Sequence, residues 1–360
     1  MPSSRALSHN QMFAVENDSL ASTKSSYSMP FVLFSQFQYP LWNWLNAFSE
    51  AIFGKSTSSF SFVVGKTHFS SFPTVAFLIT GYYVSIFAGS RLMKNRSPIR
   101  LKKTFQYYNL VFSVTSSILA LLIFEQVAPM IYQHGFFFSI CNEKAWSQPL
   151  LFLYYCAYIS KFLELADTFF LVLRKKPLQF LHYYHHGATA LLVYSQIVGR
   201  TSISWLIIEI NLLVHVVMYY YYYLVARGIR VPWKKWVTRF QIIQFFTDLG
   251  FIYFVFGTEL LYRSKNYNKY CWGHCSGEPF AAFCGLITIS SYLILFVVFY
   301  RNTYKKNAAA KKSKQSAPSN VSDNLHLKLF SKNNASLTES SCNTLVSNLG
   351  PISSGIRKDN

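Results

Sequence analysis

The sequence predicts an all-α, polytopic membrane protein with seven transmembrane helices. Only 13% of its 360 residues are charged and 51% are hydrophobic, whereas about a quarter of the residues in a soluble protein are charged. The deficit comes from long apolar runs, each close to the ~20 residues that cross a bilayer. These runs are residues 72–89, 107–124, 150–173, 178–198, 203–226, 236–256 and 280–300.

The segments that flank these runs differ from them in composition. Residues 1–70 begin with a polar, Ser-rich stretch without a cleavable signal peptide and continue into a mixed stretch with several aromatic residues. We expect a partly disordered N-terminal segment that ends at the membrane interface. Residues 71–305 form the predicted transmembrane domain. Residues 306–360 are rich in Ser, Asn and Lys, which is typical of a disordered tail.

Lysine and arginine predict the orientation of the chain. They concentrate in 91–103, 174–176, 227–235 and 301–314, which are alternate connections between the predicted spans. Because cytosolic loops carry an excess of these residues, we expect a lumenal N-terminus and a cytosolic C-terminus. The net charge of +20 is explained by this topology and by contact with membrane lipid headgroups, so we expect no nucleic-acid partner.

Three of the cysteines fall on the predicted non-cytosolic side, where disulfides persist. They are Cys141, Cys271 and Cys275. A bridge from Cys141 to either of the other two is plausible, and the sequence leaves this choice open.

Polar residues inside the predicted spans are the most informative feature, because such residues are costly in a bilayer and usually face a cavity. At ~1.5 Å of rise per residue, those of four spans fall at a similar depth in the cytosolic half. This predicts one polar chamber that opens toward the cytosol, with an apolar space beyond it. The residues concerned are Lys161, Glu164 and Asp167; His182, His185 and His186; Asn211, His215 and Tyr219; and Gln241 and Gln244.

Clustered imidazoles suit two kinds of chemistry: nucleophilic and acid–base work on an acyl group, or metal ligation. The spacing of the three histidines in the fourth span is similar to a histidine box of di-iron lipid oxidases. However, only four of the nine histidines lie at the chamber level, which leaves a di-iron site short of ligands. A single zinc site and a seven-span receptor or transporter without covalent chemistry remain as alternatives.

The same residues resemble motifs of a known family. Lys161, Glu164, Asp167 and Thr168 are similar to its motif in the third span, and Gln179, His182, His185 and His186 to its histidine box. Asn211, His215, Met218, Tyr219 and Tyr222 match its motif in the fifth span, and Thr238, Gln241 and Gln244 match its motif in the sixth. Together they resemble the ELO family of very-long-chain fatty acid elongases, most closely its fungal members, over about residues 70–305.

This resemblance implies a 3-ketoacyl-CoA synthase of the endoplasmic reticulum membrane, with seven helices that enclose an acyl tunnel. The enzyme would condense acyl-CoA with malonyl-CoA and release CoA and carbon dioxide, with no cofactor and no metal. A terminal Arg357-Lys358-Asp359-Asn360 is similar to a retrieval signal for that organelle. The partners implied are 3-ketoacyl-CoA reductase, 3-hydroxyacyl-CoA dehydratase and enoyl-CoA reductase, and the resemblance allows a homodimer.

Each motif residue receives an expected role. His185 is the acyl-accepting nucleophile, His182 and His186 orient it and exchange protons with it, and His215 polarises a carbonyl or promotes decarboxylation of malonate. Asn211, Gln241 and Gln244 donate hydrogen bonds to substrate oxygens, and Tyr219 supports the site. Glu164 and Asp167 fix histidine tautomers, and Lys161 pairs with them. At the mouth of the chamber, the CoA phosphates would meet Arg174, Lys175, Lys176, Lys234 and Lys235, although topology alone explains these charges equally well.

Overall fold

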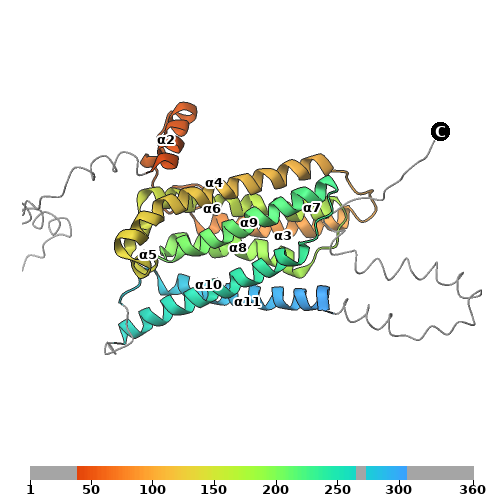
Figure 1. Ribbon diagram of the computed structural model, residues 1–360. Helices are drawn as coiled ribbons and strands as arrows, with labels where there is room; N and C mark the ends of the chain where they lie inside the picture. The colour runs from red at the N-terminus through yellow and green to blue at the C-terminus, as the bar shows by residue number, and fades with distance from the viewer. Residues whose placement is uncertain (1–38, 265–272, 306–360) are drawn as a thin grey trace, which may run out of the picture. The chain divides into compact units, whose positions relative to one another are not determined.

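The computed structural model describes residues 39–264 and 273–305, and the described part of the chain is helical throughout, without a strand. A short helix α2 (Pro40–Phe53) and the turn η1 (Thr57–Ser59) precede the long helices (Figure 1). These are α3 (Phe72–Leu92), α4 (Lys102–His134), α6 (Gln148–Glu164), α7 (Ala166–Leu173), α8 (Phe180–Gly199), α9 (Ser204–Arg227), α10 (Lys234–Arg263) and α11 (Pro279–Tyr300). The short elements α5 (Phe136–Cys141) and η2 (Glu143–Trp146) connect α4 to α6, and a π-helical turn, Arg301–Lys305, continues α11.

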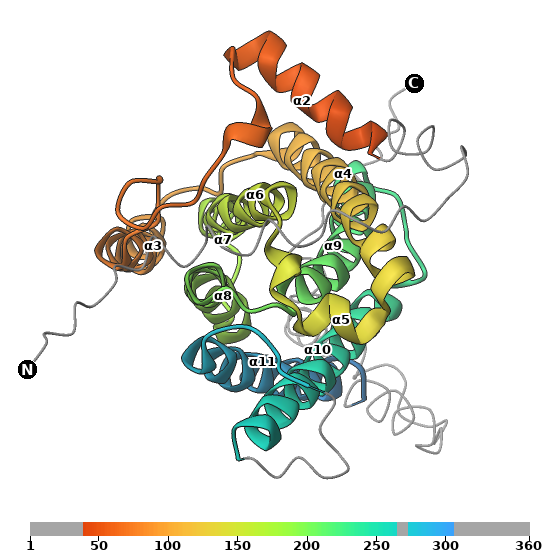
Figure 2. The same cartoon turned by 90° about the vertical axis from the view of Figure 1, so that its left-hand side faces the viewer.

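The long helices run alongside one another and form a closed ring, in the order α4, α9, α10, α11, α8, α6 and back to α4 (Figure 2). Helix α3 packs outside this ring, against α7 and α8. Its approach to α8 depends on Gly187, because a Cβ atom there would overlap the ring of Tyr83. The ring therefore has an interior to which α6, α8, α9, α10 and α11 all contribute side chains.

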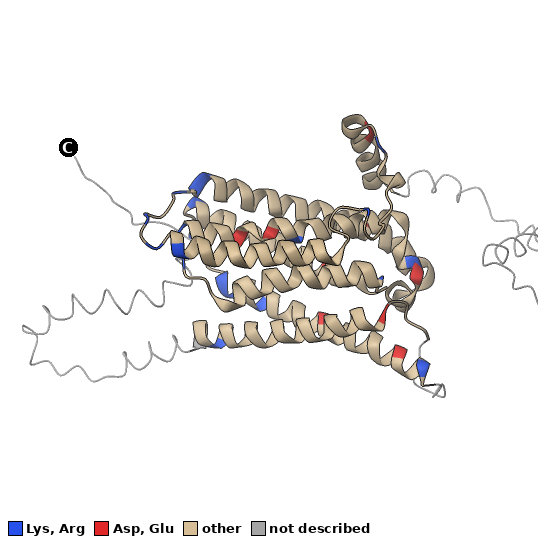
Figure 3. Cartoon of the chain, turned by 180° about the vertical axis from the view of Figure 1, so that it is seen from behind, with Lys and Arg blue, Asp and Glu red and all other residues tan. Residues whose placement is uncertain are grey.

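The two ends of the bundle differ in composition. Most of the Lys and Arg residues of the described chain gather at one end, here called the basic end, where α4 and α10 begin (Figure 3). The opposite end, here called the disulfide end, carries α2, α5 and a disulfide between Cys141 and Cys275. This bridge is one of the two pairings that the sequence left open, whereas Cys271 lies outside the described residues.

Five of the described helices are long and apolar enough to cross a membrane: Phe72–Leu92, Lys102–His134, Ser204–Arg227, Lys234–Arg263 and Pro279–Tyr304. They correspond to five of the seven predicted spans. The predicted span 150–173 is divided in the structure, because the chain breaks at Leu165 into α6 and α7. The predicted span 178–198 coincides with α8. This helix is less apolar than the five helices above, because it carries three histidines and a glutamine.

Candidate active site

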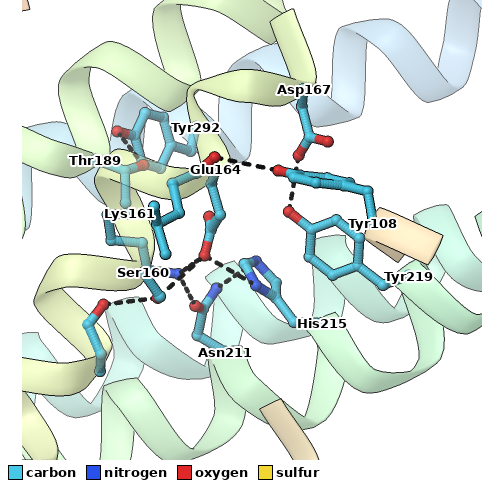
Figure 4. Close-up of polar contacts among 12 residues, drawn as sticks. Tyr108, Ser160, Lys161, Glu164, Asp167, Thr189, Asn211, His215, Tyr219 and Tyr292 are labelled. Carbon is cyan, nitrogen blue, oxygen red and sulfur yellow. Dashed lines mark hydrogen bonds and ion pairs between the residues drawn. The ribbon is translucent and has the colours of Figure 1, made fainter. Parts of the chain in front are cut away.

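A buried ionic cluster joins α6 to α9 in the middle of the bundle (Figure 4). Lys161 Nζ donates to Glu164 Oε1 at 2.9 Å and to Asn211 Oδ1 at 2.7 Å. Glu164 Oε1 also lies 3.5 Å from His215 Nδ1, and Asn211 Nδ2 lies 3.4 Å from His215 Nε2. Since Lys161 occupies the amide oxygen of Asn211, the amide nitrogen must face His215. The cluster therefore favours a neutral His215 with its proton on Nδ1.

The break between α6 and α7 brings a second carboxylate to the site. At the break, the amides of Leu165 and Thr168 bond to carbonyls three residues back, as in a 3₁₀ turn. Tyr108 of α4 donates to the carbonyl of Leu163 at 3.2 Å. Asp167, just after the break, accepts a hydrogen bond from Tyr219 Oη at 2.8 Å (Figure 4). The structure thus pairs Asp167 with a tyrosine, where the sequence suggested a histidine.

The three histidines of α8 project from one face of the helix. The ring centres of His182 and His186 are 4.6 Å apart, and the ring centre of His185 is 4.6 Å from that of Tyr292. His182 Nε2 and His185 Nδ1 are buried and have no hydrogen-bond partner among the described residues. An imidazole nitrogen that is buried without a partner is costly, and both residues line a cavity, so these two atoms are candidates for contact with a ligand.

Helix α10 adds the two glutamines to the same site. Gln241 Nε2 donates to Met218 Sδ at 3.2 Å, and Gln244 Nε2 donates to Asp248 Oδ2 at 3.2 Å. Asp248 is 1% exposed, and its Oδ1 atom has no hydrogen-bond partner in the described chain. Each amide therefore has one contact that orients it, and each keeps its oxygen for a ligand.

These side chains line a cavity of about 180 Å³, here called the histidine cavity. Among the predicted site residues, Lys161, Glu164 and Tyr219 lie behind its wall, and the others from the four spans form its surface. The lining includes Asp167, His182, His185, His186, Asn211, His215, Met218, Lys234, Thr238, Gln241, Gln244, Phe245 and Phe296. The structure thus brings the predicted polar layer together around one space.

A second cavity, here called the inner cavity, lies nearer the disulfide end. It measures about 240 Å³ and is lined mainly by apolar side chains of α8, α9, α10 and α11. Its few charged lining residues are Glu259, Arg263 and Glu278, and Glu259 Oε1 accepts from Arg263 Nε at 2.7 Å. A core cluster separates the two cavities; Phe245 and Phe296 line the histidine cavity, whereas Ile252 and Ile289 line the inner one.

The basic residues expected at the mouth of the histidine cavity have different surroundings. Lys234 lines the cavity. Arg174 stacks over the ring of Phe105, with 4.9 Å between the guanidinium carbon and the ring centre. Burial, together with the positive charge of Arg174, lowers the pKa of Lys176 below its ordinary value. Lys175 donates to the carbonyls of Lys94 and Arg96, while Lys235 is exposed, 6.0 Å from the ring centre of Tyr304.

Comparison with known proteins decides the family. The family model described as "ELO: GNS1/SUR4 family" matches residues 67–312, more than half of the chain. The chain belongs to the ELO (GNS1/SUR4) family. It is 69% identical over 365 residues to a Schizosaccharomyces pombe protein named "Putative fatty acid elongase 2", with all of both chains covered. This confirms the resemblance inferred from the motifs.

Other members of the ELO family are similar over most of their length. A second S. pombe protein, "Putative fatty acid elongase 1", is 42% identical over 89% of this chain and 94% of its own. "Fatty acid elongase A" of Dictyostelium discoideum is 34% identical over 69% of this chain and 90% of its own. The match to the family model, residues 67–312, covers the helical ring and thus every wall of the histidine cavity.

Two tyrosines of the site carried no signal in the sequence. Tyr108 supports the break between α6 and α7, and Tyr292 accompanies His185, with its hydroxyl 3.0 Å from Thr189 Oγ1 and 3.3 Å from the carbonyl oxygen of His185. Tyrosine is abundant in this chain, with 25 occurrences. A single one inside an apolar run therefore gives no indication of its partner.

Proposed function

We propose that this protein is a 3-ketoacyl-CoA synthase that condenses a long-chain acyl-CoA with malonyl-CoA in the membrane of the endoplasmic reticulum. The names of its ELO relatives support a role in fatty acid elongation. The observation that carries the reaction is the histidine cavity: His182 and His185 line it next to an apolar cavity, and each has a buried imidazole nitrogen without a partner among the described residues.

In the first step, an imidazole nitrogen of His185 attacks the thioester carbonyl carbon of the acyl-CoA. The carbon–sulfur bond breaks, CoA leaves as the thiol, and an acyl-imidazole forms. His215 is suited to pass on the proton that His185 loses, since both line the cavity and Glu164 holds the opposite nitrogen of His215. An imidazole is a suitable carrier because its acyl form remains reactive.

In the second step, malonyl-CoA loses carbon dioxide, and its C2 carbon attacks the acyl carbon. The bond to His185 breaks, 3-ketoacyl-CoA is released, and the imidazole takes up one proton from solvent. The Nε2 groups of Gln241 and Gln244 each use one N–H on Met218 or Asp248, and the second N–H of each suits a thioester or carboxylate oxygen. Loss of carbon dioxide supplies the carbanion, and neither step needs an oxidant or a reductant, so the proposed reaction needs no cofactor.

Each end of the bundle takes one part of the acyl-CoA substrate. The CoA groups lie at the basic end, toward the cytosol, where Lys234 and Arg174 are placed for phosphates. The acyl chain extends past the core cluster into the inner cavity, toward the lumen, and the two cavities together form the acyl tunnel. The apolar lining of the inner cavity suits a hydrocarbon chain.

Intact-protein mass spectrometry tests the covalent step. Detergent-purified protein is incubated with a long-chain acyl-CoA in the absence of malonyl-CoA. We expect a mass gain of one acyl group in the wild type and none in His185→Ala. His134→Ala is the matched control, because His134 is exposed near the disulfide end, and it should still gain the acyl group.

Two outcomes would change the proposal. If no adduct forms but condensation proceeds once malonyl-CoA is added, the enzyme transfers the acyl group without a histidine carrier. If neither adduct nor condensation occurs with acyl-CoA substrates of any length, the synthase assignment is wrong.

A further inference from the structure

Helix α2 is amphipathic, and none of the described residues covers its apolar face. Trp42 is buried and packs edge-on against Phe152 of α6, with 6.0 Å between the ring centres. Trp44 and Phe48 stack on each other at 5.4 Å, on the other side of the helix. The exposed apolar residues are Leu41, Trp44, Phe48, Ile52 and Phe53, and four of them are spaced by three or four residues, which places them on one face.

The position of α2 is fixed at both of its ends. Glu125 of α4 accepts hydrogen bonds from the backbone amides of Leu41 at 2.8 Å and Trp42 at 2.9 Å. A carboxylate there satisfies amides at the helix N-terminus that have no partner within the helix, and it complements the helix dipole. After the helix ends, Gln148 of α6 donates to the carbonyl of Thr57 at 2.8 Å. Helix α2 lies across the bundle axis and outside the ring (Figures 1 and 2).

The surface of α4 indicates the level at which α2 lies. One face of α4 exposes a continuous apolar stripe of Tyr107, Val111, Val114, Ile118, Leu121 and Phe124. From residue 107 to residue 124 the stripe is roughly 26 Å long, at ~1.5 Å per residue, and the hydrocarbon core of a bilayer is ~30 Å thick. Glu125 directly follows the stripe. Helix α2 therefore begins where the hydrocarbon ends, with its axis along the membrane plane.

We propose that α2 is an interfacial anchor, whose exposed face inserts among lipids of the leaflet at the disulfide end. Tryptophan and phenylalanine at the boundary between headgroups and acyl chains are typical of such helices. The only charged residue of α2 is Glu50, so the helix itself supplies no electrostatic attraction to anionic lipid. The anchor therefore takes zwitterionic phospholipid and is independent of the anionic lipid content.

Site-specific photo-crosslinking tests this anchor in the full-length protein. The photoreactive p-benzoylphenylalanine replaces Phe48 or, separately, Ile52, and the protein is reconstituted in phosphatidylcholine vesicles and irradiated. We expect mass spectrometry to find phospholipid on the peptide that contains the probe. The yield should be unchanged when a fifth of the lipid is phosphatidylserine.

Two further positions calibrate the result. At Phe124, at the end of the α4 stripe, the probe should yield lipid adducts. At Glu50, which lies about 180° around the helix from Leu41 at 3.6 residues per turn, it should yield several-fold fewer. A crosslink from position 48 or 52 to a second copy of the chain would show that this face is a dimer interface. Equal lipid labelling at 48 and 50, or none at 48 and 52, would also overturn the anchor.

Discussion

Glu164 contacts Lys161 and His215 in the interior of the bundle, and its negative charge stabilises both side chains. It lies 2.9 Å from Lys161 Nζ and 3.5 Å from His215 Nδ1, and it is 3% exposed. Replacing it by Gln leaves the Lys161 ammonium without its counter-charge, and breaking a buried pair in this way costs about 3–5 kcal/mol. For Glu164→Gln we therefore expect a lower melting temperature in detergent and a condensation rate reduced at least tenfold.

Two variants separate the stability of this cluster from its chemistry. Glu50→Gln alters an exposed carboxylate and should leave both quantities unchanged. In the double variant Lys161→Met/Glu164→Leu no charge is left unpaired, so the melting temperature should recover. The rate should stay low, because His215 has lost its acceptor. A double variant as active as the wild type would remove Glu164 from the mechanism.

At the scale of the helix, the break at Leu165 determines where Glu164 and Asp167 lie, and Tyr108 supports it from α4. Tyr108→Phe removes the side-chain donor to the Leu163 carbonyl on an exposed part of α6, and a hydrogen bond of this kind contributes about 0.5–1.5 kcal/mol. We expect a lower melting temperature and a lower condensation rate. The neighbouring Tyr107 is 69% exposed, so Tyr107→Phe is the matched control. Equal behaviour of the two variants would show that the break forms without Tyr108.

The break also shows what the sequence could and could not predict. The depth of His185 or Gln244 follows from counting residues along a helix, and the polar groups that were predicted to share one level line one cavity in the structure. The break at Leu165 was not predicted, because it involves no proline or glycine and its hydroxyl donor comes from a residue 55 positions away. Contacts between helices, such as that between Tyr219 and Asp167, depend on packing that residue periodicity does not encode.

At the scale of the molecule, the disulfide joins parts of the chain that are 134 residues apart. Cys141 ends α5, and Cys275 lies before α11, where its backbone amide donates to Glu259 of α10. Removing a native disulfide typically costs 2–5 kcal/mol. We expect Cys141→Ser/Cys275→Ser to melt at a lower temperature than the wild type under oxidising conditions. With excess reductant the two should converge, and a difference that persists would have another cause.

The two cavities lie in line along α8, α10 and α11, and Tyr292 lies between them in the core cluster. It is 2% exposed, and its hydroxyl holds Thr189 and the His185 carbonyl. If the acyl chain extends from His185 into the inner cavity, it passes the core cluster, in which the ring centre of Tyr292 lies 4.6 Å from that of His185. Tyr292→Trp enlarges the obstruction, so we expect condensation of long acyl chains to fall more steeply than that of short ones in an assay with acyl-CoA substrates of graded length. Tyr184→Trp is a control, because Tyr184 is only partly buried against the same cluster and its hydroxyl contacts Ser291 rather than the His185 carbonyl. An equal loss at every chain length in Tyr292→Trp would indicate that the acyl chain takes another route.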